Sequence, residues 1–398
     1  MNQTLRVLHV LNELRPSGAE TMLRIAAPLF REQGVECEVL TTGKEAGPYA
    51  GALEAAGYRI HHMPYSRSPF FFLKVARFAR QSGYDLVHLH SERGFFPYVV
   101  AAWLAGGRKL VRTVHNNFNF SGFLRFRRGL ERRIAERLGV RFVTIAPGVD
   151  QTERRLYGTS PTLIPNWFDG VRFKPATPDA RAQARASLGI REDEYVMVTV
   201  GNCSQTKNHT VLIEALATCT ESSWCYLHVG LEEQGEPERA LAERLGIADR
   251  IRFIGAVDDV RPILNAADLY VMPSLFEGFS IATLEALGMG LPALLTDVPG
   301  LADIRQYLDG IAYCEPNAES VAAALRPLLE KGPGLDEHSA SRSAVVHRTF
   351  GAERGVRDYC ALYVEACGAA GHVPEQGMPW LIEPPARAKS GVRRDEVH

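Results

Sequence analysis

The stretch Pro273-Ser-Leu-Phe-Glu-Gly-Phe-Ser-Ile-Ala-Thr-Leu-Glu-Ala-Leu-Gly-Met-Gly-Leu-Pro292 is mostly apolar, yet it carries two glutamates, Glu277 and Glu285. An apolar run ends at Met272, so the pattern predicts a buried strand, a loop, and a helix that begins near Ser280. Strand, loop and helix form the repeating unit of a parallel α/β sheet. Functional residues are then expected in the loop, because ligands bind at the carboxyl ends of such strands.

Short β-branched runs alternate with amphipathic helical runs along most of the chain. This alternation predicts an α/β protein with two doubly wound, Rossmann-like parallel-sheet domains that face each other across a cleft. A turn-rich segment at 165–180 suits a linker between them. We expect a first domain at 1–168, a second domain at 169–350, a closing helix at 351–368 that packs back toward the first domain, and a loose tail at 369–398.

The composition is that of an ordinary globular protein: 398 residues, 46% apolar and 23% charged, are enough for two cores. A formal net charge of −1 gives no overall attraction for nucleic acid, so no such partner is expected. The seven cysteines form no C-x-x-C pair, which predicts reduced thiols and no structural zinc. The sequence shows neither a signal peptide nor a membrane-spanning run, and we expect a cytoplasmic protein.

The spacing of the two glutamates indicates an extended ligand. Eight residues along a helix amount to about 12 Å and about 80° of rotation, so Glu277 and Glu285 do not form one catalytic pair. They suit the two ends of a nucleotide sugar, with its diphosphate on the helix N-terminus, its ribose at Glu285 and its sugar at Glu277. The alternative is structural: Glu277 is then a favourable first-turn acid and Glu285 a surface residue.

A second polar loop follows the predicted strand at 195–200 and enters a helix. Lys207 at the start of this helix can meet phosphate oxygens, although a solvated surface lysine fits the sequence equally well. The chain has no Asp-x-Asp metal clamp. The protein itself must then neutralise a diphosphate, so we expect a metal-independent site without a cofactor.

In the first half, Ser17 and Glu20 have the spacing of a helix capping box, and Gly18 permits close approach to a ligand. His115 ends a predicted strand, where it either bonds a sugar hydroxyl or phosphate or is a satisfied strand-end histidine. The alternating His88-Leu-His90 could suggest a metal. No third ligand has plausible spacing, so packing in the core or cleft is preferred.

An arginine-rich amphipathic run extends over 123–137. Its apolar residues are Phe123, Leu124, Phe126, Leu130 and Ile134. Such a helix can lie on an anionic membrane surface, which predicts peripheral attachment to the inner face of the cell membrane. The alternative is a solvated surface helix whose acids partly offset its arginines.

These motifs resemble glycosyltransferase family 4, whose members are retaining nucleotide-sugar transferases with the GT-B fold of two facing Rossmann-like domains. The resemblance runs from about residue 5 to 368. Glu277-Gly-Phe-Ser-Ile-Ala-Thr-Leu-Glu285 matches the family's motif of two glutamates separated by seven residues, and Ala286–Pro292 continues it. Three further signatures are Ile164-Pro-Asn166, Ile254-Gly255 and Thr296-Asp-Val-Pro-Gly300. Arg108–Asn119 is most similar to bacterial exopolysaccharide transferases.

The resemblance implies a role for each matching residue. Glu277 would bind donor-sugar hydroxyls near the reacting carbon, Glu285 the ribose, and Lys207 the leaving phosphate. Gly18 would line the cleft, and His115 would contact the sugar. The implied diphosphate-binding amides are those of Phe279, Ser280 and Ile281.

Three positions depart from the family pattern. Asn202 stands where the family usually has a donor-binding arginine, Ser17-Gly18 replaces a double glycine, and Gly230-Leu-Glu232 replaces Gly-x-Gly. Loss of the arginine removes a charge worth about a few kcal/mol in a dry site.

The implied function is metal-independent, retaining transfer of a sugar from a nucleotide-diphosphate donor to a glycan or lipid-linked acceptor, in surface or exopolysaccharide synthesis. Two alternatives are kept. One is a sugar-nucleotide 2-epimerase of the same fold. The other is a catalytically weakened GT-B partner in a polysaccharide assembly complex, as Asn202 suggests.

Overall fold

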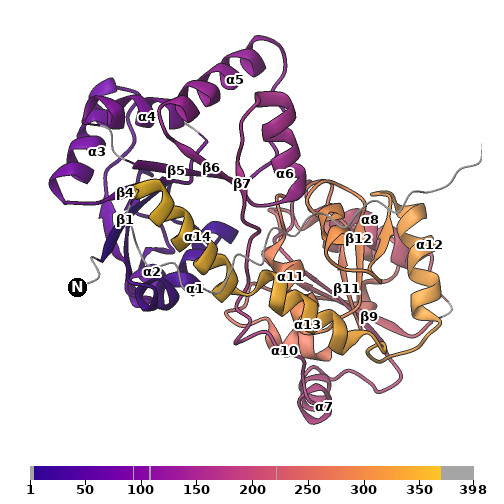
Figure 1. Cartoon of the computed structure of the whole chain (residues 1–398). Helices are drawn as coiled ribbons and strands as arrows, with labels where there is room; N and C mark the ends of the chain where they lie inside the picture. The colour runs from indigo at the N-terminus through magenta and orange to yellow at the C-terminus, as the bar shows by residue number, and fades with distance from the viewer. Residues whose placement is uncertain (1–3, 93, 107–108, 221, 369–398) are drawn as a thin grey trace, which may run out of the picture.

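A computed structural model describes residues 4–92, 94–106, 109–220 and 222–368 of the protein. Two α/β lobes lie side by side, one indigo to magenta and one orange (Figure 1). Each is built on a sheet whose neighbouring strands all pair in parallel. The predicted α/β architecture of two Rossmann-like sheets is confirmed. The predicted tail at 369–398 lies outside the described residues.

The first sheet has seven strands in the order β3-β2-β1-β4-β5-β6-β7. Its strands are β1 Leu5–Leu11, β2 Val35–Thr41, β3 Arg59–His62, β4 Leu86–Leu89, β5 Lys109–Val114, β6 Arg141–Thr144 and β7 Thr162–Leu163. The helices between them are α1 Gly18–Glu32, α2 Ala50–Ala55, α3 Pro69–Gln81, α4 Phe95–Leu104, α5 Gly122–Arg137, α6 Pro147–Thr152 and the π-helix η1 Glu153–Tyr157. Strand order reverses direction at β1, which places β1, β4 and β5 at the centre, where ligands bind in such sheets.

The second sheet has six strands in the order β10-β9-β8-β11-β12-β13. Its strands are β8 Tyr195–Val200, β9 Trp224–Val229, β10 Ile251–Gly255, β11 Leu269–Met272, β12 Ala293–Thr296 and β13 Ala312–Cys314. Its helices are α7 Pro178–Ser187, α8 His209–Ala217, α9 Pro237–Arg244, the 3-10 helix η2 Ala248–Arg250, α10 Arg261–Ala266, α11 Ile281–Gly288, the 3-10 helix η3 Ala302–Gln306, α12 Ala318–Leu329 and α13 Ser339–Phe350. The pattern repeats that of the first lobe, because β11 here takes the place of β4 beside the first strand.

Two local details differ from the sequence-based expectations. The helix expected near Lys207 begins only at His209, because Asn208 has a left-handed φ of 57° and ends the loop. Helix α7 was not expected at the end of the turn-rich segment. It forms because Thr177 Oγ1 accepts from the amide of Ala180 at 3.2 Å and Pro178 occupies the first helical turn.

The chain passes between the lobes at two adjacent points. Phe168 and Gly351 form an isolated parallel bridge, and the Phe168 amide donates to the Phe350 carbonyl at 3.1 Å. After this point α14, Ala352–Cys367, returns across the first lobe and packs against α1 and β5 (Figure 1). The last described helix therefore closes the core of the first lobe. No helix among the described residues is long and apolar enough to cross a bilayer.

Candidate active site

Glu277 is held in the loop between β11 and α11. Its Oε1 accepts hydrogen bonds from Lys207 Nζ at 2.7 Å and from Ser274 Oγ at 2.8 Å. Gly300 packs so closely on this loop that a Cβ atom there would lie 2.3 Å from the Glu277 carbonyl oxygen. Two of the predicted site residues, Glu277 and Lys207, thus form one half-buried ion pair.

The first turn of α11 presents free backbone donors. The amides of Phe279, Ser280 and Ile281 donate no hydrogen bond to another described residue. Ser280 Oγ caps the helix by accepting from the amide of Thr283 at 3.3 Å. Free amides together with the positive end of the helix dipole can bind an anion, and they follow Glu277 by two to four residues in the chain.

Glu285 lies further along α11, and burial raises the pKa of its carboxyl to about 8. The charge of Arg172 opposes this shift, Asp169 adds to it, and Arg24 opposes it. Arg24 lies on α1 and Arg172 in the segment between the lobes, so Glu285 is near groups from both lobes. At neutral pH its carboxyl is protonated, and such a group both donates to and accepts from the hydroxyls of a ribose.

Asn202 follows β8 and is tied to the neighbouring loop rather than aimed at the Glu277–Lys207 pair. Its Oδ1 accepts from the amide of Leu231 at 2.9 Å, and its side chain is exposed. The two loops lie close because a Cβ at Gly230 would be 2.2 Å from the Gly201 carbonyl oxygen. The asparagine thus bonds to the neighbouring loop, and its role in donor binding, at the position where the family usually has an arginine, stays a prediction.

Gly18 touches the start of α11 from the other lobe. A Cβ atom at Gly18 would lie 3.2 Å from Ile281 Cδ1. The N-termini of α1 and α11 therefore meet, and two predicted donor-binding residues are neighbours. The predicted capping box is wrong, because the Ser17 hydroxyl bonds the Glu20 carboxylate and not a helix amide.

His115 ends β5 and belongs to a chain of histidines. His90 Nδ1 lies 3.0 Å from His115 Nε2, and His9 Nδ1 lies 2.9 Å from His90 Nε2. Burial, with a smaller contribution from Arg112, lowers the pKa of His115 to about 4, and burial lowers that of His9 to about 3. These rings are therefore neutral at physiological pH and act as hydrogen-bonding groups.

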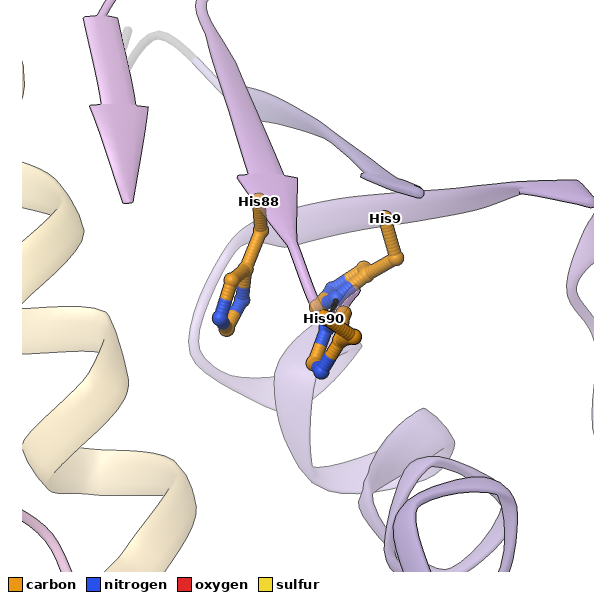
Figure 2. Close-up of side chains that lie close together, drawn as sticks. All are labelled: His9, His88 and His90. Carbon is orange, nitrogen blue, oxygen red and sulfur yellow. Dashed lines mark hydrogen bonds between the residues drawn. The ribbon is translucent and has the colours of Figure 1, made fainter. Parts of the chain in front are cut away.

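The sequence analysis found no third partner for His88 and His90, and this is corrected by the fold. Figure 2 shows His9 beside both, because β1 and β4 are neighbours and His9 pairs with His88 in register. His88 has both ring nitrogens bonded, to Tyr363 Oη and Thr113 Oγ1, each at 2.7 Å. His9 could not be recognised from the sequence as a neighbour of His90, because it lies 81 residues earlier in the chain.

The two lobes touch at the candidate site itself. Asn166 Nδ2 donates to the Phe279 carbonyl at 3.0 Å, and a Cβ at Gly278 would lie only 2.5 Å from the His115 carbonyl oxygen. The Glu277 loop of the second lobe thus rests on the β5 end of the first. Sequence reasoning assigned no role to Asn166, although the signature Ile164-Pro-Asn166 marked its position.

Two family models match consecutive parts of the chain. The one described as "Glycosyltransferase Family 4" matches residues 16–171, and the one described as "Glycosyl transferases group 1" matches residues 180–344. The chain belongs to glycosyltransferase family 4. It is a glycosyltransferase, as the resemblance led us to expect.

Known relatives match most of this family 4 enzyme. EpsF of Bacillus subtilis, which carries a provisional glycosyltransferase name, is 28% identical over 309 residues, 73% of this chain and 79% of its own. The GDP-mannose:cellobiosyl-diphosphopolyprenol alpha-mannosyltransferase of Komagataeibacter xylinus is 23% identical and covers 95% of this chain and 97% of its own. The crystal structure of Anabaena HepE in complex with UDP has a TM-score of 0.76 at 20% identity, with 91% of this chain and 100% of that one covered. This last likeness bears on the fold.

Proposed function

We propose that this glycosyltransferase moves a sugar from a nucleotide-diphosphate donor to a glycan or lipid-linked acceptor, with retention and without a catalytic metal. The observation that carries the proposal is the Glu277–Lys207 pair beside the free amides of α11, in a loop that rests on the His115 carbonyl across the lobe boundary. It supplies one cation, one carboxylate and an anion site within a single loop region. That set matches the parts of a sugar diphosphate.

Donor binding would rearrange the ion pair. A diphosphate on the amides of Phe279, Ser280 and Ile281 attracts the Lys207 ammonium, and Glu277 is then released to accept from sugar hydroxyls. Ser274 keeps the carboxylate oriented through its hydroxyl. Glu285, protonated at neutral pH, would bind the ribose. Donor binding would therefore replace the Lys207–Glu277 ion pair by two contacts with the donor, one from each side chain.

Catalysis would rest on the departing phosphate. As the bond from the sugar to the diphosphate oxygen breaks, negative charge grows on that oxygen, and Lys207 together with the α11 amides stabilises it. His115 would position the sugar through its free Nδ1, since its Nε2 faces His90. The acceptor hydroxyl attacks from the face that the phosphate leaves and gives its proton to the departing phosphate oxygen, which yields retention and a free nucleoside diphosphate. Correct placement of that hydroxyl supplies much of the remaining acceleration.

The ligands and names of relatives support the donor class and the proposed role. Anabaena HepE was crystallised with UDP and with UDP-glucose, and the K. xylinus relative is named for transfer from GDP-mannose to a diphosphopolyprenol-linked acceptor. The chain also resembles EpsF and EpsD of B. subtilis. We propose a role in surface or exopolysaccharide synthesis on the cytoplasmic side of the membrane.

Release of nucleotide tests the donor site. Wild type is incubated briefly with uridine, guanosine and adenosine diphosphate sugars in EDTA, and compared with Glu277→Gln and with Glu214→Gln, which changes an exposed glutamate of α8. We expect one donor to be cleaved, the rate to fall about 100-fold or more in Glu277→Gln, and Glu214→Gln to match wild type. Equal rates in both variants, or complete loss in EDTA, would overturn this function.

Two alternative functions can be tested separately. The alternative of a catalytically weakened partner rests on Asn202, whereas in the epimerase alternative water takes the place of the sugar acceptor. Asn202 is exposed and bonded to the Leu231 amide, so an arginine there has room to reach the diphosphate. Asn202→Arg should raise turnover if the asparagine limits the enzyme. An inactive wild type that Asn202→Arg activates favours the partner function, whereas release of a 2-epimerised free sugar without any acceptor favours the epimerase.

We also propose that α5 docks on an anionic membrane. Phe123 and Phe126 are 78% and 68% exposed, and Leu124 and Leu130 are also exposed. The helix instead buries Gly129, Arg132 and Ala135 toward the lobe. Its apolar face is thus left free, with arginines beside it to meet lipid phosphates.

Vesicle binding tests this surface. Phe123→Glu/Phe126→Glu should lose most co-sedimentation with vesicles that contain phosphatidylglycerol, while Leu245→Glu, at an exposed leucine after α9, should keep it. Binding of the double variant at the level of wild type would exclude α5 as the docking element. Equal binding of wild type to neutral phosphatidylcholine vesicles would exclude the role of its arginines.

A further inference from the structure

Cys203, His209 and His228 form a buried cluster behind the Lys207 loop. Cys203 follows β8, His209 is the first residue of α8, and His228 lies on β9. Their side chains are 6%, 1% and 0% exposed. One candidate ligand atom from each lies within 4.8 Å of the others, and Cys203 Sγ is 3.5 Å from His228 Nε2. The spacing of three soft or borderline ligand atoms suits one metal ion.

Several polar atoms of this cluster lack a partner. Both ring nitrogens of His209 and the Nδ1 of His228 are buried without a hydrogen bond to another described residue. A buried polar group that has no hydrogen-bond partner destabilises the folded state. The open nitrogens of His209 lie close to a thiol that His228 Nε2 also meets, and this arrangement indicates a ligand that the protein chain does not itself provide.

Glu238 adds a carboxylate beside the thiol, although its oxygens are not part of the group of atoms within 4.8 Å of one another. It lies in the first turn of α9, is buried, and its Oε2 has no hydrogen-bond partner among the described residues. Its carboxylate interacts with the thiol of Cys203. Backbone groups of Gly201 and Asn202 lie against His228 and His209, as the outer partners of metal-bound imidazoles usually do.

The histidines of Figure 2 make a useful contrast, because five of their six ring nitrogens already have partners and His9 Nε2 is the exception. His88 uses both ring nitrogens on Tyr363 and Thr113, and His90 uses both on His9 and His115. A metal there would have to break hydrogen bonds that the fold supplies. In the Cys203 cluster a metal would bind a ring nitrogen of His209, and neither His209 nitrogen has a hydrogen-bond partner among the described residues.

Against the sequence-based expectation of no structural zinc, we propose that Cys203, His209 and His228 bind one Zn²⁺ ion, with a water molecule as the fourth ligand and the Glu238 carboxylate beside the thiol. Zinc prefers four-coordinate sites and, among common divalent ions, combines thiolate and imidazole ligands readily. Binding replaces the thiol proton, which leaves to solvent, by a sulfur–zinc bond. The thiolate and the carboxylate balance the two positive charges, so the buried site is neutral. This site is separate from the donor chemistry, which needs no metal in the function proposed above.

The ion would brace the loop that carries Lys207. Cys203 and His209 flank residues 204–208, and His228 belongs to the neighbouring strand β9. One ion therefore ties both ends of this loop to β9. It would hold Lys207 in reach of Glu277 without touching either side chain.

Metal analysis tests the proposal independently of activity. Protein purified without chelators should contain about one zinc per chain, and replacement by Co²⁺ should give the near-ultraviolet thiolate-to-cobalt charge-transfer band. Cys203→Ser should lose that band and most of the zinc. Cys219→Ser, at another buried cysteine of the same lobe, should keep both.

Two results would overturn the zinc site: wild type with no more zinc than Cys203→Ser, or a wild-type cobalt spectrum without the charge-transfer band. His228→Gln offers a second variant if Cys203→Ser does not fold, and it should retain the sulfur ligand but show a weaker affinity by about 10-fold or more. Zinc affinity equal to wild type in a folded His228→Gln would also reject the site.

Discussion

At the scale of single residues, burial and ionisation oppose each other at the Glu285 carboxyl. A carboxyl that is buried, as Glu285 is at the proposed ribose site, resists ionisation, and burial raises its pKa to about 8 against a usual 4.5. In the unfolded chain the group ionises above pH 4.5, whereas in the folded protein it holds its proton until about pH 8. Folding stability contributed by this group is therefore lost as pH rises through that window.

Glu285→Gln should remove this pH dependence. At pH 5 the variant and wild type should have similar melting temperatures, and at pH 9 the variant should melt higher by roughly a few degrees. Thermal melts at pH 5, 7 and 9 measure the difference, with Glu214→Gln as the exposed control. A difference that stays constant from pH 5 to pH 9 would contradict the raised pKa of Glu285.

His90 is predicted to position His115 rather than to touch the substrate. Its two ring nitrogens bond His9 and His115, so it decides which His115 nitrogen carries the proton. His90→Phe should lower kcat about 10-fold with little change in KM, because Nδ1 of His115 loses its fixed hydrogen-bonding role. His90→Gln, which can still bond His115, should recover part of kcat. Equal kcat in the two variants would reject a positioning role.

At the scale of elements, α5 is attached to the first lobe by charge rather than by apolar packing. Arg132 is fully buried, and its Nε donates to Glu153 at 3.0 and 3.1 Å and its Nη2 to Glu92 at 3.1 and 3.3 Å. Its guanidinium lies 4.3 Å from the ring centroid of Tyr157. This anchor explains how the helix can leave four large apolar residues exposed.

Removing Arg132 alone should destabilise the folded protein far more than removing Arg132 and Glu153 together. Arg132→Met leaves Glu153 as an uncompensated buried charge and should cost about 3–5 kcal/mol of unfolding free energy. Arg132→Met/Glu153→Met should recover much of that loss. Chemical denaturation of both variants and of Glu153→Met completes the cycle. Additive losses would show that Arg132 and Glu153 do not act as a pair.

The helices and strands themselves could be predicted from the sequence, but the contacts between them could not. The order of strands and helices followed from apolar periodicity, and the Glu277 loop from its place after a buried strand. Contacts between strands that are distant in sequence did not follow. Cys203 and His228 are 25 residues apart and meet only because β8 and β9 pair. The Ser17–Glu20 bond shows the same limit, because one hydroxyl had two acceptable partners.

At the scale of the whole molecule, the two lobes are joined by backbone as well as by side chains. The bridge from Phe168 to Gly351 and the return of α14 hold one side of the boundary. The contact of Gly278 with the His115 carbonyl holds the boundary at the active site. Sequence patterns predicted two lobes and a turn-rich segment, but they carry no information on such close backbone approach.

Gly278 offers a test of that contact because its backbone conformation suits any residue and only the space is missing. A Cβ atom there would lie 2.5 Å from the His115 carbonyl oxygen and 3.2 Å from Asn116 Oδ1, so Gly278→Ala must move the Glu277 loop or the end of β5. We expect turnover to fall about 10- to 100-fold, since a displacement of about 1 Å costs that much in a positioned site.

Gly51→Ala is the matched control, because a Cβ on that α2 glycine meets nothing within 4 Å, and its turnover should equal that of wild type. Melting temperatures separate a local shift from general unfolding. If the boundary contact is as tight as described, Gly278→Ala also opens the lobes, and small-angle scattering should report a larger radius of gyration than for Gly51→Ala. Wild-type turnover and an unchanged radius in Gly278→Ala would mean that the lobes have room to separate at this point without consequence for the reaction.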